Sequence, residues 1–332
     1  MTARSMVLAV HDSSQVGAAR RAAVAEAERL GAAESESGKV ALVVTELATN
    51  LARHAGGGEL LLRSLTEPAA LEIVAIDRGP GMASVEQALR DGYSTGGTNG
   101  VGLGAVQRVA DRCEIFSAHG SGTAVLARLR LTAVRSGEVV VAGVSVPQPG
   151  EMVSGDAWSW HAGGHGWSVL VADGLGHGPD AATAAAEAVR IFQQRVTDSA
   201  ADIMGAAHAA MRHTRGAAVA IAEVRPAEGT LTFTGVGNVG GTLLTAEGPR
   251  SLVSLPGIVG HECRKVQTFT YAWPRGSSLV LYSDGLQSRW SLDRYPTLRS
   301  RDPALLAAVL YRDFARGRDD VTVVASREVG PG

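Results

Sequence analysis

The residues best suited to chemistry in this sequence are aspartates that follow runs of apolar residues in the C-terminal half. Asp173 ends the run WSVLVA and begins Asp-Gly-Leu, and Asp284 ends SSLVLYS and begins the same tripeptide. Asp156 lies in a Gly-Asp pair upstream, and Asp319-Asp320 precede the run VTVV. A single Asp-Gly is also typical of a turn. Several such positions together predict one shared site.

The chemistry of that site follows from where the carboxylates must lie. A strand of continuous apolar residues is usually buried on both faces, so a carboxylate at its end is aimed at one edge of the core. Carboxylates that converge repel each other unless a cation neutralises them. Hard oxygen ligands favour Mg²⁺ or Mn²⁺. Two such ions about 4 Å apart can bind and deprotonate a bridging water for in-line attack on a phosphate ester.

Other catalytic groups are poorly represented in the sequence. Neither Cys113 nor Cys263 lies in a cysteine-nucleophile motif, which disfavours a cysteine phosphatase. The histidines show no HExxH-type zinc spacing. His177 follows Asp173 closely and has two interpretations, a proton donor beside the metals or a loop histidine without a role.

A second group of candidate residues forms three motifs in the N-terminal half. Glu46 and Asn50 are four residues apart, so they share one face of a predicted helix. Asp77 follows the run EIVAI and begins a turn with two glycines, which suits recognition of a ring amine. The glycine-rich stretch 96–104 precedes a predicted helix, where backbone N–H groups and the helix N-terminus can bind phosphate. Each motif alone has a structural explanation, but three in this order predict ATP binding.

The elements that must position these residues are mixed α and β in both halves. The apolar residues of 37–55 recur at i, i+3, i+4 and i+7 and predict an amphipathic helix. We place a boundary near residue 135, where a Pro- and Gly-punctuated strand-like stretch begins. The C-terminal half has strand-like runs and helical segments at 180–196, about 199–213 and 303–315. The strand-like runs are GWSVLVAD, AAVAIAEV, TLTFTGV, SSLVLYSD and DDVTVVAS.

Length and composition narrow the class of protein. A chain of 332 residues is expected to form two domains. The formal net charge of −2 provides no basic field for nucleic acid or anionic membrane, so neither is an expected partner. No apolar run approaches the roughly 20 residues of a membrane span, and the start does not resemble a signal peptide. Only two cysteines are present, which favours a cytoplasmic location.

The three N-terminal motifs together form the signature of the GHKL-type ATP-binding fold. VTELATN at 44–50, DRGPGM at 77–82 and DGYSTGGTNGVGLGAVQRVAD at 91–111 resemble the RsbT-like serine kinases of bacterial sigma-factor switches. The resemblance covers nearly all of residues 5–131 and implies phosphorylation of a serine on a STAS-domain partner.

This resemblance also implies roles for individual residues. Glu46 would be the base for the acceptor hydroxyl, Asn50 would hold Mg²⁺, and Asp77 would recognise adenine. The other candidate nucleotide-binding residues are Gly79, Gly81, Gly100, Gly102, Gly104 and Thr123.

The C-terminal half resembles the SpoIIE/RsbX branch of the PPM metal-dependent phosphatases from about 138 to 327. The matching segments are SGDAW at 154–158, VADGLGHG at 171–178, RGAAVAIAEV at 215–224, FTGVGNVGG at 233–241, LPGIVG at 255–260, LYSDGL at 281–286 and RDDVTVV at 318–324. The resemblance implies phosphoserine or phosphothreonine substrates on STAS-domain proteins. The metal-binding residues it implies for two Mn²⁺ or Mg²⁺ ions are Asp156, Asp173, Gly174 through its carbonyl, Asp284, Asp319 and Asp320.

Two details of this second resemblance remain open. The family pattern favours Asp319 over Asp320 as the direct ligand, and Asp156 would bind directly or through water. Asp156 is followed by Ala157-Trp158, where many SpoIIE-type phosphatases carry two aromatic residues and an aspartate. An additional carboxylate near the metals is therefore in doubt.

The predicted fold class is α/β (α+β), with a GHKL-type α/β sandwich over 1–134 and a PPM-type α-β-β-α sandwich over 135–332. We first hypothesise an RsbT-like kinase fused to an RsbX-like phosphatase, with Asp173 and Asp284 catalytic in the second half. A second hypothesis keeps the phosphatase but gives the first half only nucleotide or partner binding. A third, a scaffold that sequesters a STAS protein or sigma factor, predicts lost metal ligands and ranks last because they are present.

Overall fold

The computed structural model describes residues 5–66, 69–89, 102–131, 141–295 and 297–328, and the chain divides into two compact units. The N-terminal unit consists of Ser5–Glu138 together with Asp293–Arg312, and the C-terminal unit contains Val139–Leu292 and Asp313–Gly332. Among the described residues, no helix combines the length and the apolar character needed to cross a membrane.

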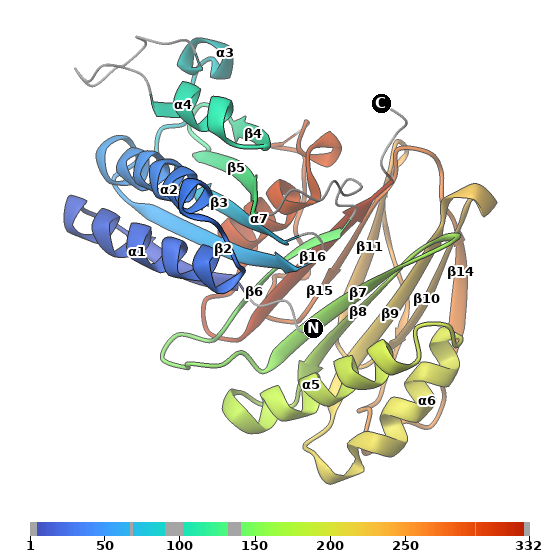
Figure 1. Ribbon diagram of the computed structural model, residues 1–332. Helices are drawn as coiled ribbons and strands as arrows, with labels where there is room; N and C mark the ends of the chain where they lie inside the picture. Colours follow the sequence, from blue (N-terminus) through green and yellow to red (C-terminus); the bar gives the residue numbers. More distant parts are fainter. Residues whose placement is uncertain (1–4, 67–68, 90–101, 132–140, 296, 329–332) are drawn as a thin grey trace. The chain divides into compact units, whose positions relative to one another are not determined.

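The N-terminal unit is built on a five-stranded antiparallel sheet with the order β1-β2-β3-β5-β4 (Figure 1). Its strands are β1 (Ser5–Val10), β2 (Gly58–Thr66), β3 (Ala69–Ile76), β4 (Arg112–Ser117) and β5 (Thr123–Arg130). Its helices are α1 (Ser13–Arg29), α2 (Glu34–His54), α3 (Val85–Ala88), α4 (Gly102–Val109) and most of α7 (Pro303–Phe314).

Helices α1 and α2 cover one face of this sheet (Figure 1). The predicted apolar stripe of α2 is buried against alternate sheet residues such as Leu60, Leu62 and Ile73. Helix α1 begins with a capping box in which Asp12 and Gln15 bond each other's backbone N–H groups. The N-cap residue of α1 is therefore Asp12.

The opposite face of the sheet carries buried charged residues as well as apolar ones. Arg63, Glu72 and Arg128 alternate with the residues that face α2, so they point away from it. Arg128 contacts Asp302, directly before α7, with 3.4 Å between Nη2 and Oδ1. The sheet is thus covered on this side by a segment from the far end of the chain.

This segment, Asp293–Arg312, is where the structure differs from the predicted division of the chain. The predicted boundary itself lies in 132–140, outside the described residues. The helix predicted at 303–315 is present as α7, but all of it up to Arg312 groups with the N-terminal unit. A division at a single point cannot describe this arrangement.

The C-terminal unit contains two largely antiparallel sheets. The first has the order β13-β10-β9-β8-β7, with β14 also paired to β10, and the second has the order β12-β11-β15-β16-β6. The strands of the first are β7 (Asp156–Gly163), β8 (Gly166–Gly174), β9 (Ala217–Arg225), β10 (Thr230–Val236), β13 (Ser254–Leu255) and β14 (Thr268–Ala272). Those of the second are β6 (Val141–Val146), β11 (Gly240–Thr245), β12 (Gly248–Ser251), β15 (Ser278–Tyr282) and β16 (Val321–Arg327).

The two sheets share one apolar core that contains Trp158, Phe233 and Leu281. Helices α5 (Gly178–Gln194) and α6 (Ala200–Ala210) pack their buried alanines against the outer face of the first sheet (Figure 1). The described part of this unit therefore shows helix, sheet and sheet, which are three of the four predicted layers. Because the helical layer is on its outer side, β8 is buried on both faces and its terminal Asp173 lies at the edge of the core.

Candidate functional site

The first pair of acidic residues is set by the register between β7 and β8. Asp156 at the start of β7 lies directly opposite Asp173 near the end of β8. Residues directly opposite each other in an antiparallel pair point to the same face, so the two carboxylates are neighbours. Asp156 is 6% exposed. Ser283 Oγ donates a hydrogen bond of 2.6 Å to Asp156 Oδ2, which holds this side chain in place from the second sheet.

Asp284 reaches the same region from the end of β15. Asn238, in the turn between β10 and β11, donates through Nδ2 to Asp284 Oδ2 over 2.6 Å. The structure gives Asn238 a definite contact with a predicted catalytic carboxylate.

Asp319 and Asp320 have different environments despite being adjacent. Asp320 is 3% exposed, and its two carboxylate oxygens accept hydrogen bonds of 2.8 Å from the backbone N–H groups of Gln148 and Gly155. Asp319 instead lines a pocket of about 630 Å³. Asp320 thus anchors two neighbouring loops, while the Asp319 carboxylate is available to a ligand.

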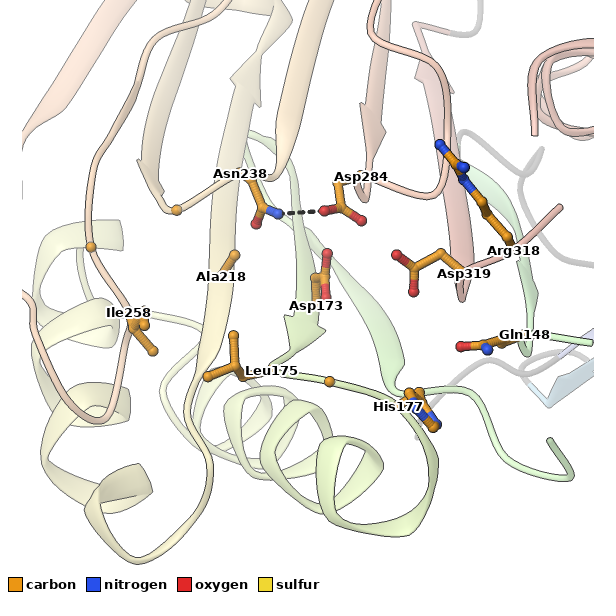
Figure 2. Close-up of a pocket in the computed structure, with 13 residues that line it drawn as sticks. Gln148, Asp173, Leu175, His177, Ala218, Asn238, Ile258, Asp284, Arg318 and Asp319 are labelled. Atoms are coloured by element: carbon orange, nitrogen blue, oxygen red, sulfur yellow. Dashed lines mark hydrogen bonds between the residues drawn. The ribbon is translucent and has the colours of Figure 1, made fainter. Parts of the chain in front are cut away.

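Figure 2 shows Asp173, Asp284 and Asp319 pointing toward one another across this pocket. Asn238, Gln148, His177 and Arg318 also line it. His177 precedes α5, and its Nδ1 lies 2.7 Å from Glu151 Oε1. Gly174 ends β8 beside Asp173, and a Cβ there would lie 2.1 Å from the carbonyl oxygen of Ala181.

The electrostatics of the pocket are those of crowded, like-charged groups. Burial raises the pKa of Asp156, and the neighbouring Asp173 raises it further. Burial and the charge of Asp284 raise the pKa of Asp173 to about 7. Burial and the charge of Asp319 raise the pKa of Asp284. These shifts show that the ionised carboxylates lack sufficient positive charge around them.

The donor chemistry of this site fits hard divalent cations. The three side chains that point toward one another, Asp173, Asp284 and Asp319, present carboxylate oxygens, which Mg²⁺ and Mn²⁺ prefer over sulfur or nitrogen ligands. A bound cation would also favour the ionised forms that burial and repulsion disfavour. As placed, no three acidic, histidine or cysteine side chains among the described residues already form a closed metal cage.

The second set of predicted residues is brought together in the N-terminal unit. Asp77 follows β3, and its Oδ1 accepts hydrogen bonds from the N–H groups of Gly79 (2.8 Å) and Thr123 (3.1 Å). Among the described residues no hydrogen bond to Oδ2 is found, so this oxygen can accept from a ligand amine. Burial raises the pKa of Asp77 against the effect of these two hydrogen bonds. Thr123, one of the candidate nucleotide-binding residues, contacts Asp77 through its backbone N–H.

Glu46 and Asn50 lie beside the first residue of α4, as the motif order predicted. A Cβ on Gly102 would be 2.9 Å from Glu46 Oε2 and 3.8 Å from Asn50 Oδ1. Because Gly102 has no side chain, the N-terminus of α4 lies close to Glu46 and Asn50, and a phosphate could bind there. Gly104 is buried in α4, and Gly81 packs against the carbonyl oxygen of Ala118. The predicted Gly100 lies outside the described residues.

One residue of this site could not be inferred from the motifs. Arg312 at the end of α7 donates through Nη1 to the carbonyl oxygens of Asp77 (2.9 Å) and Thr123 (3.3 Å). It is separated from Asp77 by 235 residues in the sequence. No local pattern around Arg312 signals this contact.

Comparisons with known proteins give matches to both halves of the chain. Residues 9–129 match the family model of the histidine kinase-like ATPase domain, and residues 163–328 match that of stage II sporulation protein E, SpoIIE. The serine/threonine-protein kinase RsbT of Bacillus subtilis is 32% identical over 112 residues, which are 33% of this chain and 84% of RsbT. The phosphoserine phosphatase RsbX of the same organism is 28% identical over 139 residues, which are 41% of this chain and 69% of RsbX.

Two solved structures support the fold. A structure from work on the bacterial stressosome has a TM-score of 0.54 and 27% identity, and covers 57% of this chain and 100% of that chain. The PP2C phosphatase domain of SpoIIE from Bacillus subtilis, with a fragment of its regulatory domain, has a TM-score of 0.50 and 16% identity. That match covers 95% of this chain and 97% of the other, and it shows likeness of fold alone.

Proposed function

Because this chain belongs to the SpoIIE family of PPM-type serine/threonine phosphatases and carries an RsbT-like ATPase domain before its phosphatase domain, we propose that it dephosphorylates a STAS-domain regulator with the help of two divalent cations. The observation that carries the proposal is the convergence of Asp173, Asp284 and Asp319 on one pocket, where burial and mutual repulsion raise the pKa values of Asp173 and Asp284.

The residues proposed to hold the metal ions follow from their surroundings. Asp173, Asp284 and Asp319 face the pocket and would bind the ions directly. Asp156 is opposite Asp173 and is fixed by Ser283, so it would act as a deeper ligand or through water. When bound, Mg²⁺ or Mn²⁺ would supply an activated water and neutralise the phosphate charge.

The remaining pocket residues have proposed roles in handling protons and orienting carboxylates. Asn238 restrains Asp284 through the hydrogen bond to Oδ2, so this carboxylate keeps one orientation. With His177 Nδ1 in contact with Glu151, the imidazolium form of the ring would donate its Nε2 proton to the departing serine oxygen. Substitution of His177 would then slow substrates with poor leaving groups more than those with good ones.

The substrate class is inferred from the two halves together. RsbT is a protein kinase and RsbX a phosphoserine phosphatase, and their counterparts here lie on one chain. A phosphorylated STAS-domain protein is the partner that the resemblance to both implies. We infer a cytoplasmic role without a nucleic-acid partner, in keeping with the net charge of −2.

The test uses purified protein, a serine-phosphorylated STAS-domain protein and Mn²⁺. We expect phosphate release by the unaltered protein and loss of release in Asp173→Asn. Asp198→Asn is the matched control, because Asp198 forms only an exposed ion pair with Arg195. Equal release from the unaltered protein and Asp173→Asn would show that the assigned site is wrong.

Kinase activity of the N-terminal half is the second candidate function, with ATP and Mg²⁺ as cofactors. It is favoured by the position of Glu46 beside Gly102 at the start of α4. In an Asp284→Asn background, ATP should label a serine of the unphosphorylated partner, and Glu46→Ala should abolish this labelling. Nucleotide binding without labelling of a verified partner would instead support a sensor role.

A further inference from the structure

The segment Asp293–Arg312 is unusual because it follows most of the phosphatase sequence but is part of the N-terminal unit. Helix α7 begins in this unit, and its last two residues, Asp313 and Phe314, belong to the C-terminal unit. Asp302 caps the helix by accepting a 2.9 Å hydrogen bond from Ala304 N–H. Helix α7 is therefore divided between the two units along its sequence, with residues 303–312 in the N-terminal unit and residues 313 and 314 in the C-terminal unit.

The start of α7 is fixed by buried charges. Asp302 is 1% exposed and lies 2.9 Å (Oδ2) from Arg112 Nε. It also contacts Arg128, which is itself paired with Glu72 on the sheet. The Asp302 N–H donates to Glu114 Oε2 over 3.0 Å. Separating buried charges that are paired in this way is costly, so the helix has a defined position on the sheet.

The end of α7 holds the backbone of the nucleotide-recognition loop. Arg312 is 3% exposed, and Nη1 donates to the carbonyl oxygens of Asp77 and Thr123. Thr123 N–H also donates to Asp77 Oδ1, so Arg312 holds the backbone of a residue that orients the Asp77 carboxylate. Arg78 returns a hydrogen bond to the carbonyl oxygen of Arg312. Because the Arg312 guanidinium donates to both carbonyl oxygens, it holds the backbone of Asp77, the proposed adenine-recognition residue, in place.

Beyond Arg312 the chain runs directly into the phosphatase site. Phe314 accepts a 2.9 Å hydrogen bond from Gln287 N–H, and Arg316 N–H donates to the carbonyl oxygen of Gly285 over 2.8 Å. Gly285 follows Asp284, and Asp319 lines the pocket three residues after Arg316. Asp284 and Asp319, two of the proposed metal-binding residues, are thus attached to the segment that follows α7.

We propose that Arg312, which comes from the phosphatase half of the sequence, is a positioning residue of the nucleotide site. Through α7, nucleotide binding at Asp77 is then coupled to the carboxylates of the phosphatase pocket. The proposal rests on the proposed function, since it needs both sites to bind their ligands. A change in the Asp77 loop displaces Arg312, and the chain from 312 to 319 transmits this displacement to Asp284 and Asp319. Linkage requires the effect to be reciprocal for binding.

The experiment uses the full chain, ADP and p-nitrophenyl phosphate at constant free Mn²⁺. ADP binding is measured by calorimetry, and phosphatase kcat and KM are measured with and without saturating ADP. We expect ADP to change kcat/KM by at least about 5-fold, the lower end of common allosteric couplings. In Arg312→Gln we expect kcat/KM to be about the same with and without ADP, and we expect ADP to bind more weakly. Arg20→Gln, at an exposed position on α1, is the matched control and should keep both values.

Arg312→Lys separates positioning from simple support of the fold. It keeps the charge but not the planar fork, so we expect partial recovery of ADP affinity and of the ADP effect relative to Arg312→Gln. A purely structural role would lower thermal stability and both activities together without changing the ratio. If the Arg312 variants do not fold, Asp284→Asn still tests the coupling, because it should shift the ADP affinity relative to the unaltered protein.

The outcomes distinguish the two levels of the argument. No ADP binding or no phosphate release by the unaltered protein would contradict the proposed function. If the unaltered protein binds ADP and releases phosphate but has the same kcat/KM with and without ADP, the coupling is overturned and the proposed function remains intact. An unchanged ADP effect in Arg312→Gln would exclude Arg312 as the positioning residue.

Discussion

The substitution Glu72→Gln tests how the N-terminal sheet is stabilised on the face covered by α7. Burial alone would raise the pKa of Glu72, but the charges of Arg63 and Arg128 outweigh it and lower the pKa to about 2 from 4.5. This lowering corresponds to about 3 kcal/mol of stability at neutral pH. Glu72→Gln leaves two buried arginines with less compensation, and we expect it to destabilise the unit by about 3–5 kcal/mol.

The same residue predicts a pH dependence with a definite sign. Because the folded-state pKa is depressed, the stabilisation is present above pH 4.5 and is lost as pH falls toward 2. By pH 3.5 the unaltered protein should have lost about 1.4 kcal/mol through Glu72, with the full loss reached near pH 2. Glu72→Gln should lack this part of the acid sensitivity.

The positions of the tryptophans make the assay specific. All five tryptophans, at 158, 160, 167, 273 and 290, lie in the C-terminal unit, so urea unfolding followed by tryptophan fluorescence reports on that unit alone. Far-UV circular dichroism reports on both. We expect Glu72→Gln to shift the dichroism transition more than the fluorescence transition, with exposed Glu28→Gln as the control. If the two variants show the same midpoint and the same acid slope, the buried cluster contributes no net stability and the reasoning fails.

Three further predictions concern the two sites. Asp319→Asn should weaken Mn²⁺ binding by at least about 10-fold in calorimetry, with little change in melting temperature. Asp320→Asn should instead mainly destabilise the protein, by about 1–3 kcal/mol, because the Gln148 and Gly155 N–H groups lose a carboxylate acceptor. The reverse pattern would exchange the roles of the two residues. Chelation with EDTA should abolish phosphate release and added Mn²⁺ or Mg²⁺ should restore it, and activity that survives chelation would argue against metal-dependent chemistry. Asp77→Asn should weaken ADP binding by about 10–100-fold in calorimetry. Oδ1 accepts from two N–H groups, so the new NH₂ group must face the ligand amine. Unchanged ADP affinity would show that Asp77 does not recognise adenine.

The sequence was most informative where a local pattern coincides with the end of a strand. Asp173 and Asp284 were assigned from apolar runs that end in Asp-Gly, and in the structure β8 ends at Gly174 and β15 ends at Tyr282, two residues before Asp284. The predicted helix with Glu46 and Asn50 and the turn after Asp77 also follow from local periodicity and glycine placement. These features depend on neighbouring residues alone, so a single sequence contains them.

Other parts depend on contacts between residues that are distant in the sequence. The pairing of Asp156 with Asp173 requires the register of β7 and β8, which a turn at Gly164 and its neighbours sets. The separate environments of Asp319 and Asp320 depend on the backbone N–H groups of Gln148 and Gly155. No composition or periodicity reveals such partners.

The return of Asp293–Arg312 to the N-terminal unit also has a consequence for how the protein is made. Residues 5–131 leave the ribosome first, but Asp302 and Arg312 are synthesised up to about 180 residues later. At typical rates of synthesis this delay is roughly 10–40 s. During that interval Glu72 and Arg128 have no helix over them, and the Asp77 loop lacks its arginine. Asp319 is synthesised only seven residues after Arg312, so a nascent chain cannot complete one site long before the other.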